Sequence, residues 1–153
     1  MITKIFNYHL RQPIKEAEGL TEFTDEEYSE FNSAGIKRTL RNEKFYNSPD
    51  INFMGGTWDL VIGSTDDIIY KISAQNMTND KSLSDDIFNK ILKESVAEMG
   101  KHSEHQMMSK KYIWDSKDGN VLLNQVSKMG FICINFILTS SVIRDQARIE
   151  TVF

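Results

Sequence analysis

The stretch TWDLVIGSTDDIIYKIS, residues 57–73, decides the fold because it has the pattern of two strands joined by a turn. Every second residue of 58–62 is apolar, which is the period of a strand with one buried face. Turn-forming Gly, Ser, Thr and Asp follow over 63–67, and the same alternation returns over 68–72 with Tyr70 at its centre. We predict an antiparallel hairpin whose inward face is aromatic and aliphatic.

An amphipathic helix is predicted after this hairpin, over residues 83–100 (LSDDIFNKILKESVAEMG). Its Ile, Phe, Leu, Val and Met residues recur at helical spacing and form one apolar stripe. Ser84 is a favourable N-cap, and Gly100 is a natural end for the helix. Because only one side of this helix is apolar, we expect it to lie across one face of a sheet.

The C-terminal third predicts further strands over 111–115, 120–126 and 131–140, separated by short Gly-containing turns. The alternation of the first places Tyr112 and Trp114 inward. The last, FICINFILTS, is apolar on both faces, which is typical of a central strand.

The N-terminal part has a weaker pattern. We predict a strand over 3–10, a short helix near 25–31 with a capping box, and a polar edge strand over 35–45. The acidic segment 16–30 is either a solvated surface or an acidic docking patch. The basic segment 37–44 protects a sheet edge, contacts an anionic partner or ligand, or lies against the acidic segment 16–30 of the same chain.

Short connections make the predicted strand pairing mostly antiparallel. The predicted fold class is therefore α+β: a single domain, 1–153, with a twisted sheet of about six or seven strands and one main helix on one face. No linker composition interrupts the chain. The tail, about 143–153, is predicted to be loose or a short helix.

Composition restricts the class of protein. The chain has 153 residues, a formal net charge of −4 and a single cysteine, Cys133. An acidic chain without a broad basic face argues against nucleic-acid binding. One cysteine fits a reducing compartment, and the most apolar run is too short to span a bilayer. We expect a cytoplasmic protein that does not act at a membrane.

Few residues have the spacing of a chemical site. Glu98, His102 and His105 would share one face if the helix continued through Gly100, and such a set could bind zinc; a solvated loop is the favoured alternative. Cys133 lies mid-strand among apolar residues, where no base would activate it. We predict no catalytic residue and no cofactor.

A lone helix leaves the second face of the sheet partly open, unless the two terminal segments cover it. The leading hypothesis is a non-enzymatic cytoplasmic protein–protein interaction module, such as an adaptor, chaperone or inhibitor, that binds a protein partner or forms a homodimer. An alternative is a small-ligand-binding protein or enzyme with a pocket on that face; a metal-binding protein is another. Residues expected on the open face include Asp59, Lys71, Asn135 and Ile69. The full set of candidate surface residues is Trp58, Asp59, Tyr70, Lys71, Trp114, Asn135, Arg38 and Arg41.

Overall fold

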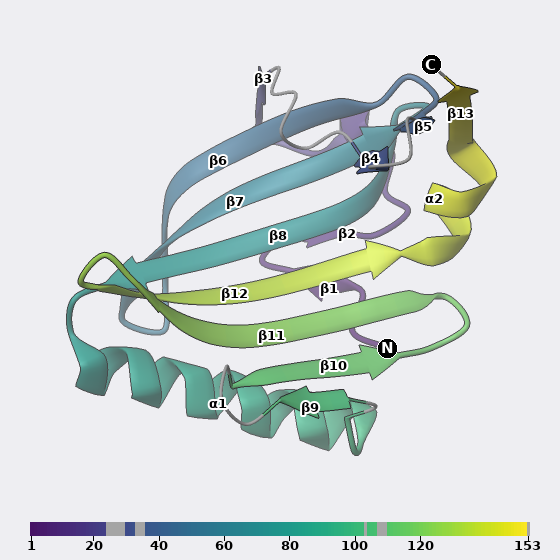
Figure 1. Ribbon diagram of the computed structural model, residues 1–153. Helices are drawn as coiled ribbons and strands as arrows, with labels where there is room; N and C mark the ends of the chain where they lie inside the picture. Colours follow the sequence, from purple (N-terminus) through teal and green to yellow (C-terminus); the bar gives the residue numbers. More distant parts are fainter. Residues whose placement is uncertain (24–29, 33–35, 103, 107–109, 153) are drawn as a thin grey trace.

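The computed structural model has one large antiparallel sheet with a single long helix across one face (Figure 1). It describes the backbone of residues 1–23, 30–32, 36–102, 104–106 and 110–152, and the side chains of 1–23, 40–102 and 110–149. The predicted α+β fold class is confirmed. Within the described residues the sheet has eight strands, because short edge strands extend it on both sides.

The elements follow one another along the chain as strands with few helical interruptions. They are β1 (Lys4–Ile5), β2 (Tyr8–His9), the 3-10 helix η1 (Ile14–Glu16), β3 (Thr21–Phe23), β4 (Glu30–Asn32), β5 (Ile36–Leu40), β6 (Lys44–Phe53), β7 (Gly56–Thr65), β8 (Ile68–Thr78), α1 (Lys81–Met99), β9 (Glu104–Gln106), β10 (Lys111–Asp115), β11 (Gly119–Lys128), β12 (Phe131–Ser140), α2 (Ser141–Ala147) and β13 (Arg148–Val152).

The large sheet consists of two antiparallel meanders that α1 connects. Its strand order is β3-β6-β7-β8-β12-β11-β10-β9. The chain leaves the sheet after β8, passes through α1, enters again at the far edge as β9, and returns strand by strand until β12 pairs with β8. The β8–β12 pairing is therefore the long-range contact that joins the two halves.

Tight turns set the register of these meanders. Both Asp66 and Asp67, between β7 and β8, have positive φ, at 49° and 62°. Met129 and Gly130, between β11 and β12, repeat this geometry with φ of 53° and 82°. Two consecutive residues with positive φ form the turn whose twist matches that of paired strands, which accounts for the predicted hairpins.

The helix α1 begins two residues before the predicted start at position 83. Its N-cap is Asp80, whose Oδ1 accepts a hydrogen bond from the Leu83 amide at 3.1 Å, and the prediction that Ser84 is the N-cap was wrong. Ser84 is instead fully buried and accepts a hydrogen bond from Gln125 of β11. Gly100 ends the helix as predicted, with φ of 78°.

The main core lies between the sheet and a layer formed by α1 and the N-terminal segment. Figure 1 shows β1 and β2 behind the sheet, and their buried side chains belong to the same apolar cluster as those of α1. This cluster contains Ile5, Tyr8, Leu10, Trp58, Leu60, Ile62, Ile69, Ile72, Ala74, Ile87, Phe88, Ile91, Trp114, Val121, Leu123, Ile134 and Leu138. The N-terminal segment therefore covers the helix side of the sheet.

Several predictions for the N-terminal half were wrong. The single strand over 3–10 is a tight hairpin instead, because the chain reverses between β1 and β2 with Phe6 at φ 54°. The helix near 25–31 extends over residues that the structure does not describe, but residues 30–31 belong to β4. The edge strand over 35–45 is the central strand β5 of a small sheet, β13-β5-β4.

Strand β6 was not predicted, because Pro49 and Asp50 interrupt its pattern. The structure accommodates them with a register shift between Ser48 and Ile51, where Asp50 has φ of 60°. The predicted tail forms α2 and then β13, which pairs with β5 and is not loose.

Candidate functional site

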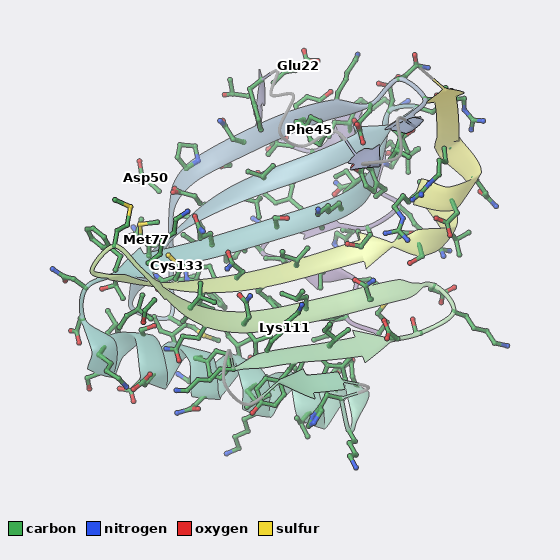
Figure 2. The ribbon with its side chains drawn as sticks, viewed as in Figure 1. Glu22, Phe45, Asp50, Met77, Lys111 and Cys133 are labelled. Atoms are coloured by element: carbon green, nitrogen blue, oxygen red, sulfur yellow. The ribbon has the colours of Figure 1, made fainter. Side chains whose placement is uncertain are left out.

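The face of the large sheet turned away from α1, here called the open face, is the candidate site. Figure 1 is viewed from this side, with α1 along the lower margin and α2 at one end of the strands. In Figure 2, Phe45, Cys133 and Lys111 are labelled on strands of this face. Strand alternation sends neighbouring residues to opposite faces, so the open face is made of cross-strand rows.

The central row of the open face is mainly apolar. It crosses the sheet through Val61, Ser73, Ile137, Leu122 and Ile113, which are consecutive partners in the strand register. All of these side chains are partly exposed. Four aliphatic groups in line across β7, β12, β11 and β10 give the open face an apolar stripe that water can reach.

A polar row runs beside the central row and is cross-linked by side-chain hydrogen bonds. Asp59, Gln75, Asn135, Asn124 and Lys111 are consecutive register partners. Gln75 Nε2 donates to Asn135 Oδ1 at 3.2 Å, and Asn135 Nδ2 donates to Asn124 Oδ1 at 2.9 Å. These bonds hold the amides in fixed orientations, so this side of the stripe presents an ordered polar border.

The opposite border of the stripe contains Lys71, Thr139, Asn120 and Asp115, again as register partners. The stripe is thus bordered on both sides by polar and charged side chains. An apolar centre with a polar rim is the usual composition of a protein–protein interface.

Tyr70 lies at the α2 end of the open face, and its prediction as an inward residue was wrong. A β-bulge between β7 and β8 shifts the register, so that Gly63 pairs with Lys71 while the next residue, Ser64, pairs with Ile69. Ile69 is consequently buried in the main core, against the prediction that it faces outward. A Cβ atom on Gly63 would lie 2.9 Å from the Tyr70 ring, so only glycine leaves room for it.

The Tyr70 side chain closes this end of the open face. Its hydroxyl donates to Glu43 Oε2 at 2.8 Å, and its ring packs in a small second core with Leu40 of β5 and Ala147 of α2. Tyr70 is therefore a structural boundary of the open face and is not available to a ligand.

The structure separates the predicted surface residues into two groups. Asp59, Lys71 and Asn135 lie on the open face, as expected from their alternation. Trp58 and Trp114 lie on the helix side and are 2% and 4% exposed. Trp58, Tyr70, Trp114 and Asn135 therefore cannot line one pocket on the open face, because the two tryptophans are on the other side of the sheet.

Both tryptophans are fixed by hydrogen bonds to backbone carbonyls. Trp58 Nε1 donates to Phe53 O at 3.2 Å, and Trp114 Nε1 donates to Gly100 O at 3.0 Å. The second bond ties β10 to the end of α1. Trp58 also borders a cavity between α1 and the sheet, which is described below.

The predicted basic residues lie in or next to β5, away from the central row. The Arg38 side chain lies outside the described residues. Arg41 Nε contacts Asp66 Oδ2 at 3.0 Å, and Asn42 Nδ2 donates to Asp66 Oδ1 at 2.9 Å. These hydrogen bonds, the one from Asn42 first, hold the pKa of Asp66 below its usual value. Arg41 thus stabilises the β7–β8 turn.

The candidate metal ligands do not share a helix face, because α1 ends at Met99. Glu98 is exposed on α1, and the His102 ring packs edge-on against Tyr112 at a centroid distance of 5.0 Å. His105 belongs to β9, opposite Tyr112 in the register, and its side chain lies outside the described residues. Among the described side chains, no group of three His, Cys, Asp or Glu residues could hold a metal ion.

Leu122 and Ile113 are the aliphatic residues of the central row that the sequence reasoning missed. Both alternate with inward-facing residues in predicted strands, so the period of two could have identified them as residues of the open face. Cys133 is only 2% exposed, as expected for a structural cysteine.

Comparison with known protein families, curated proteins and solved structures found no match for this chain. None of the helices in the described part of the chain has the length and hydrophobicity needed to cross a bilayer.

Proposed function

We propose that this protein is a non-enzymatic protein-interaction module that binds its partner with the open face. The single observation that supports the proposal is the aliphatic stripe of the central row, which remains partly exposed between two polar rows. Four aliphatic side chains, with Ser73 between two of them, give an apolar centre inside a polar rim, which is the composition typical of a surface that another protein covers.

A second copy of the chain is the partner that this face fits best. A twofold axis along the central row would place each strand against an antiparallel copy of itself. The aliphatic residues would then meet their own copies, and Lys111 would lie opposite the partner subunit's Asp115, because both are two residues from Ile113. An isologous contact requires such self-complementarity, and two sheets that pack face to face keep their strands roughly aligned.

Light scattering coupled to size-exclusion chromatography, over a series of protein concentrations, tests the dimer. The native chain should approach twice its monomer mass of 17.7 kDa as the concentration rises. Ile137→Lys should keep the protein monomeric, because it places a charge in the centre of the stripe. The matched control is Val96→Lys, which adds the same charge at an exposed aliphatic position on α1 and should leave the dimer intact.

A charge exchange tests the arrangement within the dimer. Lys111→Asp and Asp115→Lys should each weaken the dimer, because each would place like charges opposite one another. The double variant should restore it, since both positions are exchanged together. Equal weakening by the single and double variants would contradict the twofold arrangement.

If the chain is monomeric at every concentration, self-association is wrong. The proposed function then requires a different protein as the partner, which a second experiment tests. Immobilised native chain and immobilised Ile137→Lys would then be compared for capture of partners from the cells that express the protein. Capture that only the native chain achieves supports the proposed function. If neither captures a protein, the proposed function is wrong.

We also propose that the protein is cytoplasmic. Its one cysteine is buried and forms no disulfide within the chain, which fits a reducing compartment. Fractionation of expressing cells tests this, and recovery of the chain outside the cytoplasmic fraction would contradict it.

A further inference from the structure

A cavity of about 190 Å³ lies on the other side of the sheet, between α1, the β1–β2 hairpin and the ends of β6 and β7. Ala74 and Phe136 of the sheet, Trp58, and Ser95 of α1 contribute to its walls. It is therefore separated from the open face by the whole thickness of the sheet.

Aromatic rings from distant parts of the sequence form one side of this cavity. The Phe6 ring meets Phe53 at a centroid distance of 5.3 Å and Trp58 at 6.4 Å, and Phe53 meets Trp58 at 6.5 Å, all edge to face. Phe6 reaches this position from a turn residue with φ of 54°, a conformation that bulky residues rarely adopt. The hairpin thus holds an aromatic ring over the cavity at a conformational cost.

Ser95 is a polar residue in the wall of the cavity. The residue is 1% exposed, and its Oγ has no hydrogen-bond partner among the described residues. Buried hydroxyl groups nearly always have a partner, and an unsatisfied one is costly. Less than 1 Å² of this Oγ is accessible, so the Ser95 side chain would first rotate about its Cα–Cβ bond; a molecule in the cavity with a hydrogen-bonding group could then supply that partner.

The charges at the cavity favour a neutral molecule. The charged residues that border it are Lys4 and Glu94, which are opposite in sign and exposed to solvent. Opposite charges at the border give no preference for a ligand of either sign, and an ion without a counter-charge would pay a large desolvation cost among the aromatic walls.

We infer that the cavity binds a small neutral molecule with one six-membered ring and one hydroxyl group, whose hydroxyl pairs with Ser95 Oγ. Size limits the ligand, since an apolar cavity of about 150 Å³ is large enough for benzene. The cavity of about 190 Å³ accepts such a ring with one or two small substituents. This inference does not depend on the proposed function of the open face.

The probe for this site is 4-methylphenol, which is compared with toluene, the same ring and methyl group without the hydroxyl. Binding is followed by NMR through the indole N–H signals of the two tryptophans. The Trp58 signal should shift to saturation with 4-methylphenol, because Trp58 borders the cavity. Trp114 lies at the end of α1 beside Gly100, so its signal is the internal control and should not move.

The hydroxyl contact is tested with Ser95→Ala. One hydrogen bond should make native affinity for 4-methylphenol about three- to tenfold higher than that for toluene, and the variant should lose this difference. Ser84→Ala is the matched control, since Ser84 is also a buried serine of α1 but already pairs with Gln125. It should keep the native preference.

Ala74→Leu tests the location, because its added carbons would occupy the cavity from the sheet side. It should abolish the Trp58 shift, and circular dichroism should confirm that it folds. If it fails to fold, Ile91→Phe fills the same space from α1. The inference is overturned if native protein shows no saturable Trp58 shift, if toluene binds as tightly as 4-methylphenol, or if a folded, filled variant binds like the native chain.

Discussion

The two faces of one sheet differ in what covers them, although the same strands build both. On the helix side, Leu60, Ile62, Ile134 and Leu138 are completely buried beneath α1 and the N-terminal segment. On the open face, Val61, Asn135 and Ile137, which lie next to these residues in the sequence, remain partly exposed and belong to rows of mixed character. The alternation of side chains along each strand creates the two faces. The face that α1 and the N-terminal segment cover contributes more to stability, because its apolar side chains are buried.

Polar residues also behave differently on the two faces. On the open face the amides of Gln75, Asn135 and Asn124 bond to one another across strands. On the helix side, Gln125 of β11 bonds to α1 instead. The polar groups of the open face are thus a surface feature, whereas Gln125 connects two layers of the fold.

The largest effect should separate Ile134 from Ile137, which lie on opposite faces of β12. Ile134→Ala should lower the free energy of unfolding by about 2–5 kcal/mol, because it leaves a cavity beneath α1. Ile137→Ala should cost only about 1 kcal/mol, because its side chain is already partly hydrated. Urea unfolding at a concentration where the chain is monomeric measures both.

Equal losses at these two positions would contradict the comparison, because they would mean that the open face is also buried within the monomer. A rise in the cost of Ile137→Ala at high protein concentration is expected if the dimer forms, since the partner then buries this side chain.

Much of this contrast could be predicted from the sequence where alternation is uninterrupted. The bounds of β10 and β12 were predicted to the residue, together with the inward direction of Trp114 and the outward direction of Asn135. A period of two fixes which residues share a face as soon as one of them is known to be buried.

The prediction failed where geometry breaks the period. The bulge opposite Gly63 reverses the directions of Ile69 and Tyr70, and it depends on the Tyr70 ring fitting over a residue without a Cβ. The pairing of β8 with β12 and the cover from the N-terminal hairpin are long-range, so no local pattern contains them. The cavity beside Ser95 arises from three such segments meeting, and the sequence gives no sign of it.

A smaller effect should separate Gln125 from Asn124, adjacent residues on opposite faces of β11. Gln125 Nε2 donates to Ser84 Oγ at 2.9 Å and to Asp85 Oδ1 at 3.0 Å. Gln125→Ala should therefore lower the unfolding free energy by about 1–3 kcal/mol, because buried polar groups lose their partner. Asn124→Ala should stay within about 0.5 kcal/mol, as is usual for surface changes.

Urea midpoints of the two variants, measured at equal protein concentration, decide the point. A loss for Asn124→Ala as large as that for Gln125→Ala would show that the amide row of the open face is part of what holds the sheet together.

The smallest effect concerns acid sensitivity at the start of α1. Lys81 Nζ donates to Asp85 Oδ2 at 2.6 Å, and this bond, followed by the one from Gln125, lowers the pKa of Asp85 from its unfolded value near 3.8. A carboxyl group with a lowered folded pKa stabilises the protein above its unfolded pKa, and this contribution is lost as pH falls through the folded pKa. Asp85→Asn should therefore destabilise the protein at neutral pH. It should have no such effect at a pH below the pKa of Asp85 in the folded protein. Thermal unfolding from pH 7 into the acid range measures this difference.

Lys81→Gln provides the check on cause, because it removes the largest contribution to the lowered pKa and leaves the carboxylate in place. Its acid-dependent loss of stability should be intermediate between those of the native chain and Asp85→Asn. An acid limb identical to that of the native chain in both variants would contradict this account of Asp85. The effect is small because the Lys81 partner is exposed to solvent, so water and salt screen the ion pair. The helix side therefore contributes more to the free energy of unfolding mainly through buried apolar contacts. The charged contact at the start of α1 adds a small contribution that depends on pH.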